Sequence, residues 1–377
     1  MATTPVYALP YPVGTDLVRD GDNVIQALAE RVEALLAPRD ALPNFRNVLR
    51  NGDHTVWQRG PGPFTAPGFA AHYADGWKHV SVGTGATSQA DRQQDNYDVN
   101  LGGLIRSRFH TDVLVTGATT ADAQSIIAMQ SIEGFPFVSN SDVMLSFTMD
   151  VSTACTIYAE LLLDGGTLTG VVTPNVVPIA VTPGAKRYTV ALKMPTYGGA
   201  GNVTTDSLRF SLWAYCGSTS ATGFRAPMLG MTRPVAVRYS FGEIQLELGT
   251  IASPFERLPQ ALQEYWCRRY YVRYDANASN NAHFMMGVAT SAANIYFPIA
   301  FNPVMRTTPT ITWSGVGSSD GAVINKTNVS AVAFQSGYAS PQHGLIAVTL
   351  ASGATAHWPE IMSLNGAGAY IAFSAEL

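Results

Sequence analysis

The best cluster of acidic residues in this chain is Asp91, Asp95 and Asp98, in the stretch ADRQQDNYD. Carboxylate oxygens grouped in this way can hold a calcium ion, and two carboxylates placed across a glycosidic bond can act on it as acid and base. Aspartate and asparagine are also routine residues of solvated turns. The stretch therefore has three interpretations, a calcium site, a carboxylate pair and a solvated loop, of which the loop is favoured.

No motif of an enzyme class accompanies these carboxylates. The chain contains no G-x-S-x-G elbow, no H-E-x-x-H pair and no P-loop, and its seven histidines are scattered without the spacing of metal ligands. The three cysteines are too far apart in sequence to suggest a disulfide framework or a metal knuckle, and we expect small buried apolar residues at Cys155, Cys216 and Cys267. We predict no catalytic residue, no metal site and no cofactor.

Aromatic residues are better candidates for function than the carboxylates. A sugar presents an apolar CH face together with hydroxyl groups, and a Trp or Tyr ring flanked by polar groups suits both. Three such candidates lie in stretches rich in Gly, Ser and Pro, where binding residues often lie, and we predict a glycan-binding site at Tyr338, His343 and Trp358. Other aromatics are expected in the core (Trp57, Trp77 and Trp213) or wedged between domains or subunits (Trp266, Tyr270 and Tyr271).

Length and composition limit the class of protein. A chain of 377 residues suits two or three domains, and a charged content of only 13% with abundant small residues indicates many short strands and turns. The net charge of -4 and the lack of a basic cluster argue against a nucleic-acid partner. The chain shows no secretion signal and no apolar run that could span a bilayer, so we expect synthesis in a cytoplasm and no membrane insertion.

Short apolar or alternating runs predict a mainly β fold with two β-sandwich, jelly-roll-like domains after a short N-terminal arm and helix. In the first domain we expect strands at residues 126–129, 143–149, 157–163, 188–193, 208–215 and 244–248. In the second we expect strands at residues 293–299, 309–313, 329–334, 346–350 and 369–373. The pair Asn51-Gly52 predicts a tight turn with positive φ angles.

Residues 241–274 join the two predicted domains. Glu243 to Leu248 alternate polar and apolar residues, which predicts a strand with one buried and one wet face. After a turn at Ser253-Pro254, residues 260–271 have helical spacing, with Leu262, Trp266 and Tyr270 on one face. A closing strand should therefore lead into a connecting helix.

The N-terminal region has two parts. Residues 4–14 are rich in Pro and Tyr without a period, which predicts an extended arm that orders against a partner. A helix should follow and end before Pro38, with heptad positions at Ile25, Leu28, Val32 and Leu35. The pattern alone fits either a short coiled-coil stalk or an ordinary amphipathic helix.

Several sequence words occur in an order that resembles a known class of protein. They are QLE at 245–247, GTIASPFE at 249–256 and EYWCRRYY at 264–271, with PVYALPYP at 5–12, ALAERVE at 27–33, NVLRNGD at 47–53, ADGW at 74–77 and FNPVMRTTP at 301–309. Taken in their order along the chain, these words resemble those of tail fibre or receptor-binding (minor tail) proteins of tailed bacteriophages, especially of phages of actinobacterial hosts. Such proteins carry a carbohydrate-binding-module-like jelly roll.

The resemblance implies a division into domains and a role. Residues 1–45 would be a virion-anchoring arm with a short coiled-coil helix, residues 46–258 a carbohydrate-binding-module-like sandwich, and residues 259–377 a connecting helix with a tip sandwich. The protein would be a structural component of the virion tail that attaches the phage to a host cell-surface polysaccharide. Its arm would contact other tail or baseplate proteins. The alternatives are a polysaccharide depolymerase and a purely architectural tail or baseplate protein.

The expected assembly rests on two conflicting indications. Ile25 and Val32 at a positions with Leu28 and Leu35 at d positions favour a parallel dimer. The resemblance implies a trimer, and about two heptads offer too little interface to overrule large β domains packed about an axis. We therefore predict a homotrimer held chiefly by residues 265–377, with the apolar stretches 295–299 and 369–373 at the subunit contact.

Overall fold

The computed structural model describes residues 2–3, 10–11, 25–28, 30–32, 46–66, 70–94, 107–117, 120–134, 139–164, 169–173, 175–198, 207–219, 231, 236–276, 282–319, 329–364 and 368–376. Asp95, Asp98, Leu35 and most of the predicted arm lie outside these ranges. Near the N-terminus, β1 (Ala2–Thr3) pairs with β2 (Pro10–Tyr11). Residues 25–28 and 30–32 are helical, as the heptad pattern predicts, and Ile25 is exposed.

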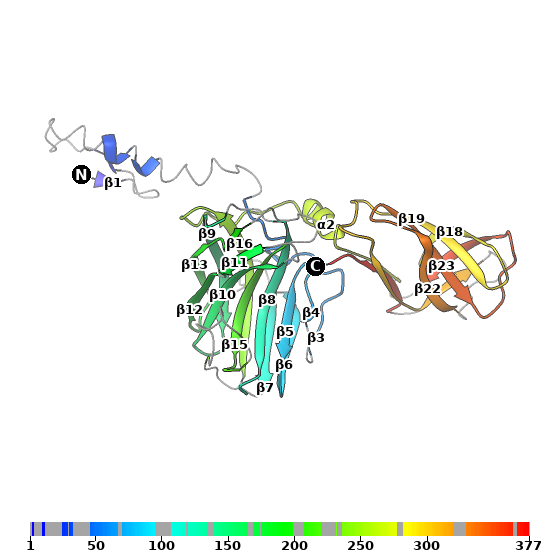
Figure 1. Ribbon diagram of the computed structural model, residues 1–377, viewed down its shortest axis with the longest axis horizontal. Coiled ribbons are helices and arrows are strands. Elements are labelled where there is room, and N and C mark those ends of the chain that lie inside the picture. Colours follow the sequence, from blue (N-terminus) through cyan, green and yellow to red (C-terminus); the bar gives the residue numbers. More distant parts are fainter. Residues whose placement is uncertain are drawn as a thin grey trace.

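The first β-sandwich has two six-stranded antiparallel sheets that face each other (Figure 1). One sheet has the order β12 (Asn175–Val181), β10 (Cys155–Asp164), β15 (Ser207–Cys216), β8 (Gln124–Glu133), β5 (Lys78–Val82) and β4 (Ala70–His72). The other has the order β13 (Lys186–Lys193), β9 (Asp142–Val151), β16 (Val237–Leu248), β7 (Phe109–Gly117), β6 (Ala86–Gln94) and β3 (Phe64–Thr65). A separate pair joins β11 (Thr169–Thr173) and β14 (Thr196–Gly198).

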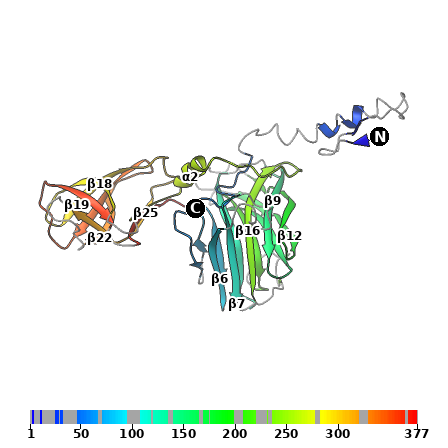
Figure 2. The same ribbon diagram turned by 180° about the vertical axis from the view of Figure 1, so that it is seen from behind.

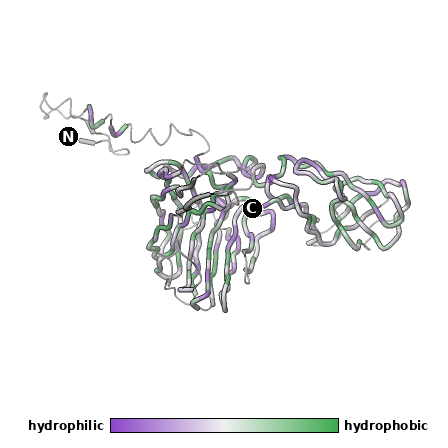
Figure 3. Tube along the Cα trace, viewed as in Figure 1, coloured by the Kyte–Doolittle hydropathy of each residue, from purple (hydrophilic) through white to green (hydrophobic). Residues whose placement is uncertain are grey.

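Apolar side chains from both sheets fill the space between them, and Figure 3 shows apolar and polar positions interleaved along the strands. Trp57 and Trp77 belong to this core, and Trp213 is buried in a smaller cluster with Ile126 and Cys216. The predicted burial of these three tryptophans is confirmed. Cys216 and Cys267 are buried as expected, whereas Cys155 is only partly buried, and none of the three forms a disulfide bond.

The second β-sandwich packs a six-stranded sheet against a three-stranded one. Figures 1 and 2 show it beside the first sandwich. The larger sheet has the order β21 (Val316–Ser319), β24 (Pro359–Leu364), β18 (Ala282–Ala289), β19 (Asn294–Ala300), β23 (His343–Leu350) and β22 (Val329–Ala339). The smaller has the order β17 (Tyr271–Asp275), β25 (Tyr370–Ser374) and β20 (Thr310–Ser314). The predicted mainly β fold with sandwich-like domains is confirmed.

Each stretch that the sequence assigned to a strand lies in or overlaps a strand of the structure. Others were missed, and β6 shows why. Its sequence ATSQADRQQ is polar or small on both faces, so it carries no apolar alternation. It is a strand because its nine residues pair in register with β7.

The apolar stretches 295–299 and 369–373 do not support the predicted subunit contact. Ile295, Phe297 and Ile299 of β19, and Ile371 and Phe373 of β25, all point into the core of their own sandwich. Their apolar character is therefore explained within one chain, because each strand lines the space between its two sheets.

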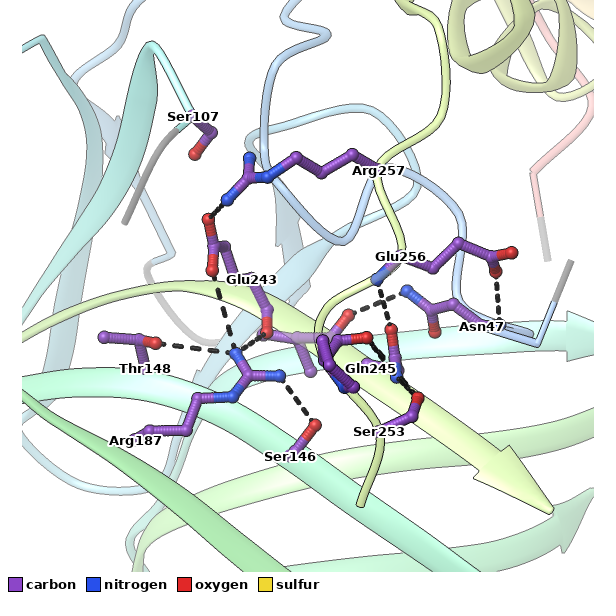
Figure 4. A network of polar contacts seen from close by, with 12 residues as sticks. Asn47, Ser107, Ser146, Thr148, Arg187, Glu243, Gln245, Ser253, Glu256 and Arg257 are labelled. Atoms are coloured by element: carbon purple, nitrogen blue, oxygen red, sulfur yellow. Dashed lines mark hydrogen bonds and ion pairs between the residues drawn. The ribbon is translucent and has the colours of Figure 1, made fainter. Parts of the chain in front are cut away.

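The expected wet face of β16 is buried. Glu243, Gln245 and Glu247 are almost inaccessible to solvent. The chain that follows β16, residues 249–259, lies over this face and is called the strap below (Figure 4). The prediction of one wet face was wrong because the strap replaces water as the partner of these polar groups.

Two serine and glutamate contacts hold the strap. Ser253 donates from its hydroxyl to Glu247 Oε2 at 2.6 Å and from its backbone N–H to Glu247 Oε1 at 2.8 Å. Gln245 accepts from the backbone N–H of Glu256 at 2.7 Å and donates to Ser253 Oγ at 2.9 Å. The stretches QLE and ASPFE, which the sequence analysis assigned to a strand and a turn, are thus hydrogen-bonded to each other.

The opening turn joins the same seam. Asn51 has a positive φ of 49°, as predicted, but Gly52 is required for a different reason. A Cβ at Gly52 would collide with the carbonyl oxygen of Ile244, and the backbone N–H of Ile244 donates to the Gly52 carbonyl at 2.8 Å. Gly52 is therefore needed because it lets the backbone of the turn approach β16 closely, and not because it has a positive φ as expected.

The connecting helix α2 (Gln260–Arg268) is shorter than predicted, and Tyr271 already begins β17. Its buried face carries Gln263 and Cys267, while Leu262 and Trp266 are only partly buried. The prediction placed the buried face one residue away because Gln263 looked like a surface residue. Gln263 is buried because it donates to the carboxylate of Asp53 at 2.8 Å.

Polar contacts fix the second sandwich to the first at a joint beside the C-terminus (Figure 1). The Gln58 side chain donates to Asp75 Oδ2 at 2.6 Å and to the backbone carbonyl of Tyr271 at 2.8 Å. Arg59 contacts Asp75 and Glu376 and lies 3.6 Å from the ring centroid of Tyr271. The buried tyrosines Tyr270 and Tyr271 therefore do lie between domains, as expected.

Candidate functional site

Two of the three predicted binding residues share one pocket. Tyr338 ends β22 and His343 begins β23, and both line an open pocket of about 310 Å³ together with Pro298 of β19 and Leu345 of β23. Tyr338 is 61% exposed. The sequence indicated the tyrosine and the histidine, but it did not indicate Pro298, which comes from a strand about forty residues earlier in the chain.

An irregularity in β22 directs Tyr338 outward. Phe334 pairs with Ile346 and Ala339 pairs with Gly344. Between these two pairs, β22 contains more residues than its partner β23. The extra residues form a bulge that breaks the normal alternation of side chains. A Cβ at Gly344 would collide with the ring of Phe334, so glycine is required there for the strands to approach.

Ser340 holds the turn that carries His343. Its hydroxyl accepts hydrogen bonds from the backbone N–H groups of His343 at 3.1 Å and Gln342 at 3.3 Å, and its own N–H donates to the His343 carbonyl at 2.9 Å. Ser340 Oγ also lies 3.4 Å from His343 Nδ1. The pocket therefore places the exposed ring of Tyr338 beside an imidazole, two groups that suit the CH face and the hydroxyls of a sugar.

Trp358 lies apart from this pocket. It is 52% exposed, and its carbonyl accepts from Ala289 at the end of β18. The pocket lies where Ala300 pairs with His343, whereas Trp358 lies near the other end of β19, where Asn294 pairs with Thr349. Six residues of strand separate these ends, a distance of about 20 Å. The structure brings Tyr338 and His343 together but does not bring Trp358 to them.

Of the acidic cluster, only Asp91 can be placed. It lies in β6 on the outer side of the first sandwich and pairs in register with Asp112 of β7. Burial, and then the charge of Asp112, raise the pKa of Asp91. Asp112 in turn has His110 Nε2 at 3.3 Å. Asp91 is thus a strand residue with a carboxylate neighbour, which differs from the solvated loop that we expected.

Searches of the described residues for two further kinds of site gave no candidate. No group of three or more His, Cys, Asp or Glu side chains in the described ranges is placed to hold a metal ion. No helix in that part of the chain is long and apolar enough to cross a membrane.

Comparisons with known proteins add structural likenesses. No protein-family model and no curated protein matches the chain. Among solved structures, the enzymatically active domain of tailspike protein 4 of bacteriophage CBA120 is 14% identical with a TM-score of 0.31, over 54% of this chain and 21% of that chain.

Two of the other likenesses are carbohydrate-binding modules. A family 11 module from Clostridium thermocellum, in complex with a β-1,3-1,4-mixed-linked tetrasaccharide, is 11% identical with a TM-score of 0.29, over 50% of this chain and 96% of that chain. The module TmCBM61, in complex with β-1,4-galactotriose, is 10% identical with a TM-score of 0.28, over 54% of this chain and 99% of that chain. This chain is similar to these structures over about half its length, and it spans only about a fifth of the tailspike structure.

Proposed function

We propose that this protein is a component of a bacteriophage tail that attaches the particle to a polysaccharide on the host surface. The observation that carries the proposal is the pocket on the second sandwich, where the exposed ring of Tyr338 lies beside His343. An exposed ring can stack on the CH face of a sugar, and the adjacent imidazole can bind its hydroxyls. The sequence resemblance to tail fibre proteins supplies the biological setting.

The joint supports this role mechanically. When the second sandwich binds a cell, it must transmit force to the rest of the particle. A flexible connection between the two sandwiches would not keep the binding surface oriented. Here the strap, α2 and β17 are hydrogen-bonded to the first sandwich through Glu247, Asp53 and Gln58. Several copies on one particle would raise weak single-site affinity through a high effective concentration.

The binding test uses the full chain and fragments of the host surface polysaccharide. We expect Tyr338→Ala to weaken binding about tenfold, because loss of one sugar-stacking ring removes on the order of 1.5 kcal/mol. Its melting temperature should hardly change, since the ring is exposed. His343→Ala should act in the same direction.

Trp358→Ala is the matched control for short oligosaccharides. It also removes an exposed aromatic ring from the second sandwich, but about 20 Å from the pocket. Unchanged binding by Tyr338→Ala at full stability would remove the pocket from the proposal, and equal weakening by Trp358→Ala would place the sugar across the whole sheet. A wild-type protein that binds no susceptible cell would favour the purely architectural role.

Attachment to the particle is proposed for the N-terminal arm. Deletion of residues 4–37 should leave a folded protein that still binds cells but no longer enters virions. Normal incorporation of the truncated chain into particles would exclude this role for the arm.

We further propose that the protein acts by binding without covalent chemistry. The carboxylate pair Asp91 and Asp112 is the group to test for the rival depolymerase activity. Incubation with the polysaccharide should produce no new reducing ends. If reducing ends appear and Asp91→Asn abolishes them, the protein is a depolymerase.

A further inference from the structure

A second cleft lies between the two sandwiches, away from the pocket at Tyr338. It has a volume of about 540 Å³ and is lined on one side by Arg92, Arg108 and Phe109 of the first sandwich. On the other side, Arg268 of α2 and Arg273 of β17 line it. Four guanidinium groups from three separate segments therefore converge on one cavity, in a chain whose net charge is -4.

Few carboxylates balance these arginines. Glu264 and Asp275 also line the cleft, so its four guanidinium groups outnumber its carboxylates by two. Asp275 lies 2.7 Å from two nitrogens of Arg273, and Glu264 accepts from Gln260 at 2.9 Å. Among the ion pairs of the described residues, none involves Arg92, Arg108 or Arg268.

Two of these groups lie against the same aromatic ring. The guanidinium of Arg92 lies 4.3 Å and that of Arg108 lies 5.1 Å from the centroid of the same buried ring, Phe109. Burial, and then the charge of Arg108, lower the pKa of Arg92. Two like charges placed together cost free energy unless an anion lies between or beside them.

We propose that this cleft binds an oxyanion carried by a surface polymer, either the carboxylate of a uronic acid or the phosphate of a phosphodiester. A guanidinium donates two parallel hydrogen bonds to either group, and a planar fork fixes the orientation of the bound polymer. Thr55, Gln58 and Gln260 also line the cleft, so its wall is polar. This site does not depend on the pocket at Tyr338.

The test measures binding of three soluble probes to the full chain by calorimetry: oligogalacturonate, an oligomer of glycerol phosphate, and a neutral dextran oligomer. We expect at least one anionic probe to bind, with affinity that falls steeply as salt is added, and dextran not to compete for the cleft. Arg108→Gln and Arg268→Gln should each weaken the anionic probe about tenfold, because each removes one charge-assisted contact. Both side chains are exposed, so both variants should fold.

Arg238→Gln is the matched control. It makes the same substitution at an exposed arginine that does not line the cleft and that pairs in register with Leu114 on the same sheet. Its binding should equal that of the wild type, and so should that of Tyr338→Ala. The proposal is overturned if neither anion binds, or if Arg238→Gln weakens binding as much as Arg108→Gln. Binding of only one anion identifies the polymer as a uronate or as a phosphodiester.

Discussion

Arg269 joins the two sandwiches by binding Glu133, a residue 136 positions earlier in the chain. Its Nη2 donates to Glu133 Oε1 at 2.8 Å and its Nε to Glu133 Oε2 at 3.1 Å, while Nη1 donates to the carbonyl of Val304 at 3.1 Å. One guanidinium therefore contacts the last residue of β8 and the loop before β20. The pKa of Arg269 is raised, first by the hydrogen bond to Glu133.

Arg269→Ala should loosen this joint. We expect a loss of about 1 kcal/mol in the free energy of unfolding, since the pair is bidentate but partly exposed. Amide hydrogen exchange should increase in β17 and around Val304. Lys193→Ala is the control because Lys193 forms a more exposed pair with Asp142 at 2.8 Å, and it should change stability by no more than about 0.5 kcal/mol. Equal effects of the two variants would contradict the assigned role of Arg269.

Ser253→Ala should detach the strap. The substitution removes the donor to Glu247 and an acceptor for Gln245, both of which are buried, so we expect a loss of about 1–3 kcal/mol. Ser330→Ala, at an exposed serine of β22, should cost less than about 0.5 kcal/mol. Denaturant titration measures both, and a neutral Ser253→Ala would show that the strap contributes little to stability.

Glu376 should make the protein sensitive to acid. Burial opposes its ionisation, but the hydrogen bond from His72 and the charge of Arg59 outweigh it and lower the pKa of Glu376 to about 2. Because this value lies below the ordinary 4.5, the ionised form stabilises the fold above pH 4.5, and that stability is lost as the pH falls toward 2. Glu376→Gln should be less stable at pH 7 and show a flatter decline below pH 4.5 than the wild type, and an equally steep decline would contradict this role of Glu376.

Asp75 should have the opposite effect. Burial raises its pKa from 3.8 to about 7, although Arg59 partly offsets this. The folded protein then binds a proton that the unfolded chain releases between these values, so the contribution of Asp75 to stability falls as the pH rises from 3.8 to about 7. Chemical denaturation at pH 5 and pH 8 should show a smaller difference for Asp75→Asn than for the wild type. An unchanged difference would assign the effect to another group.

Native mass measurement should find a homotrimer. The outer face of the six-stranded sheet in the second sandwich exposes apolar side chains of β18, with Met286 68% and Val288 48% accessible. Such an apolar surface favours contact with another subunit. Met286→Glu with Val288→Glu should reduce the mass to that of a monomer without loss of fold, because both side chains point away from the core. A dimer in the wild type would show that the N-terminal heptad governs assembly, and a monomer would exclude the fibre architecture.

The sequence by itself determined the fold class and the position of many strands. Runs such as 143–149 and 346–350 carry enough apolar residues to show where the chain must be buried, because the hydrophobic effect acts on the residues regardless of what they later contact. It also placed Tyr338 and His343 in a stretch whose glycines and serines favour a turn. Both residues do line one pocket.

Only the tertiary structure decided which polar residues are buried and which distant residues meet. Glu247 looked like a surface residue, and it is buried because Ser253 and the strap satisfy both of its oxygens. Trp358 looked like a partner of Tyr338, and the register of β19 places it at the other end of the sheet. The arginine cleft left no local pattern at all, because Arg92, Arg108 and Arg268 converge through strand pairing and domain contact, which depend on residues far from each of them in the chain.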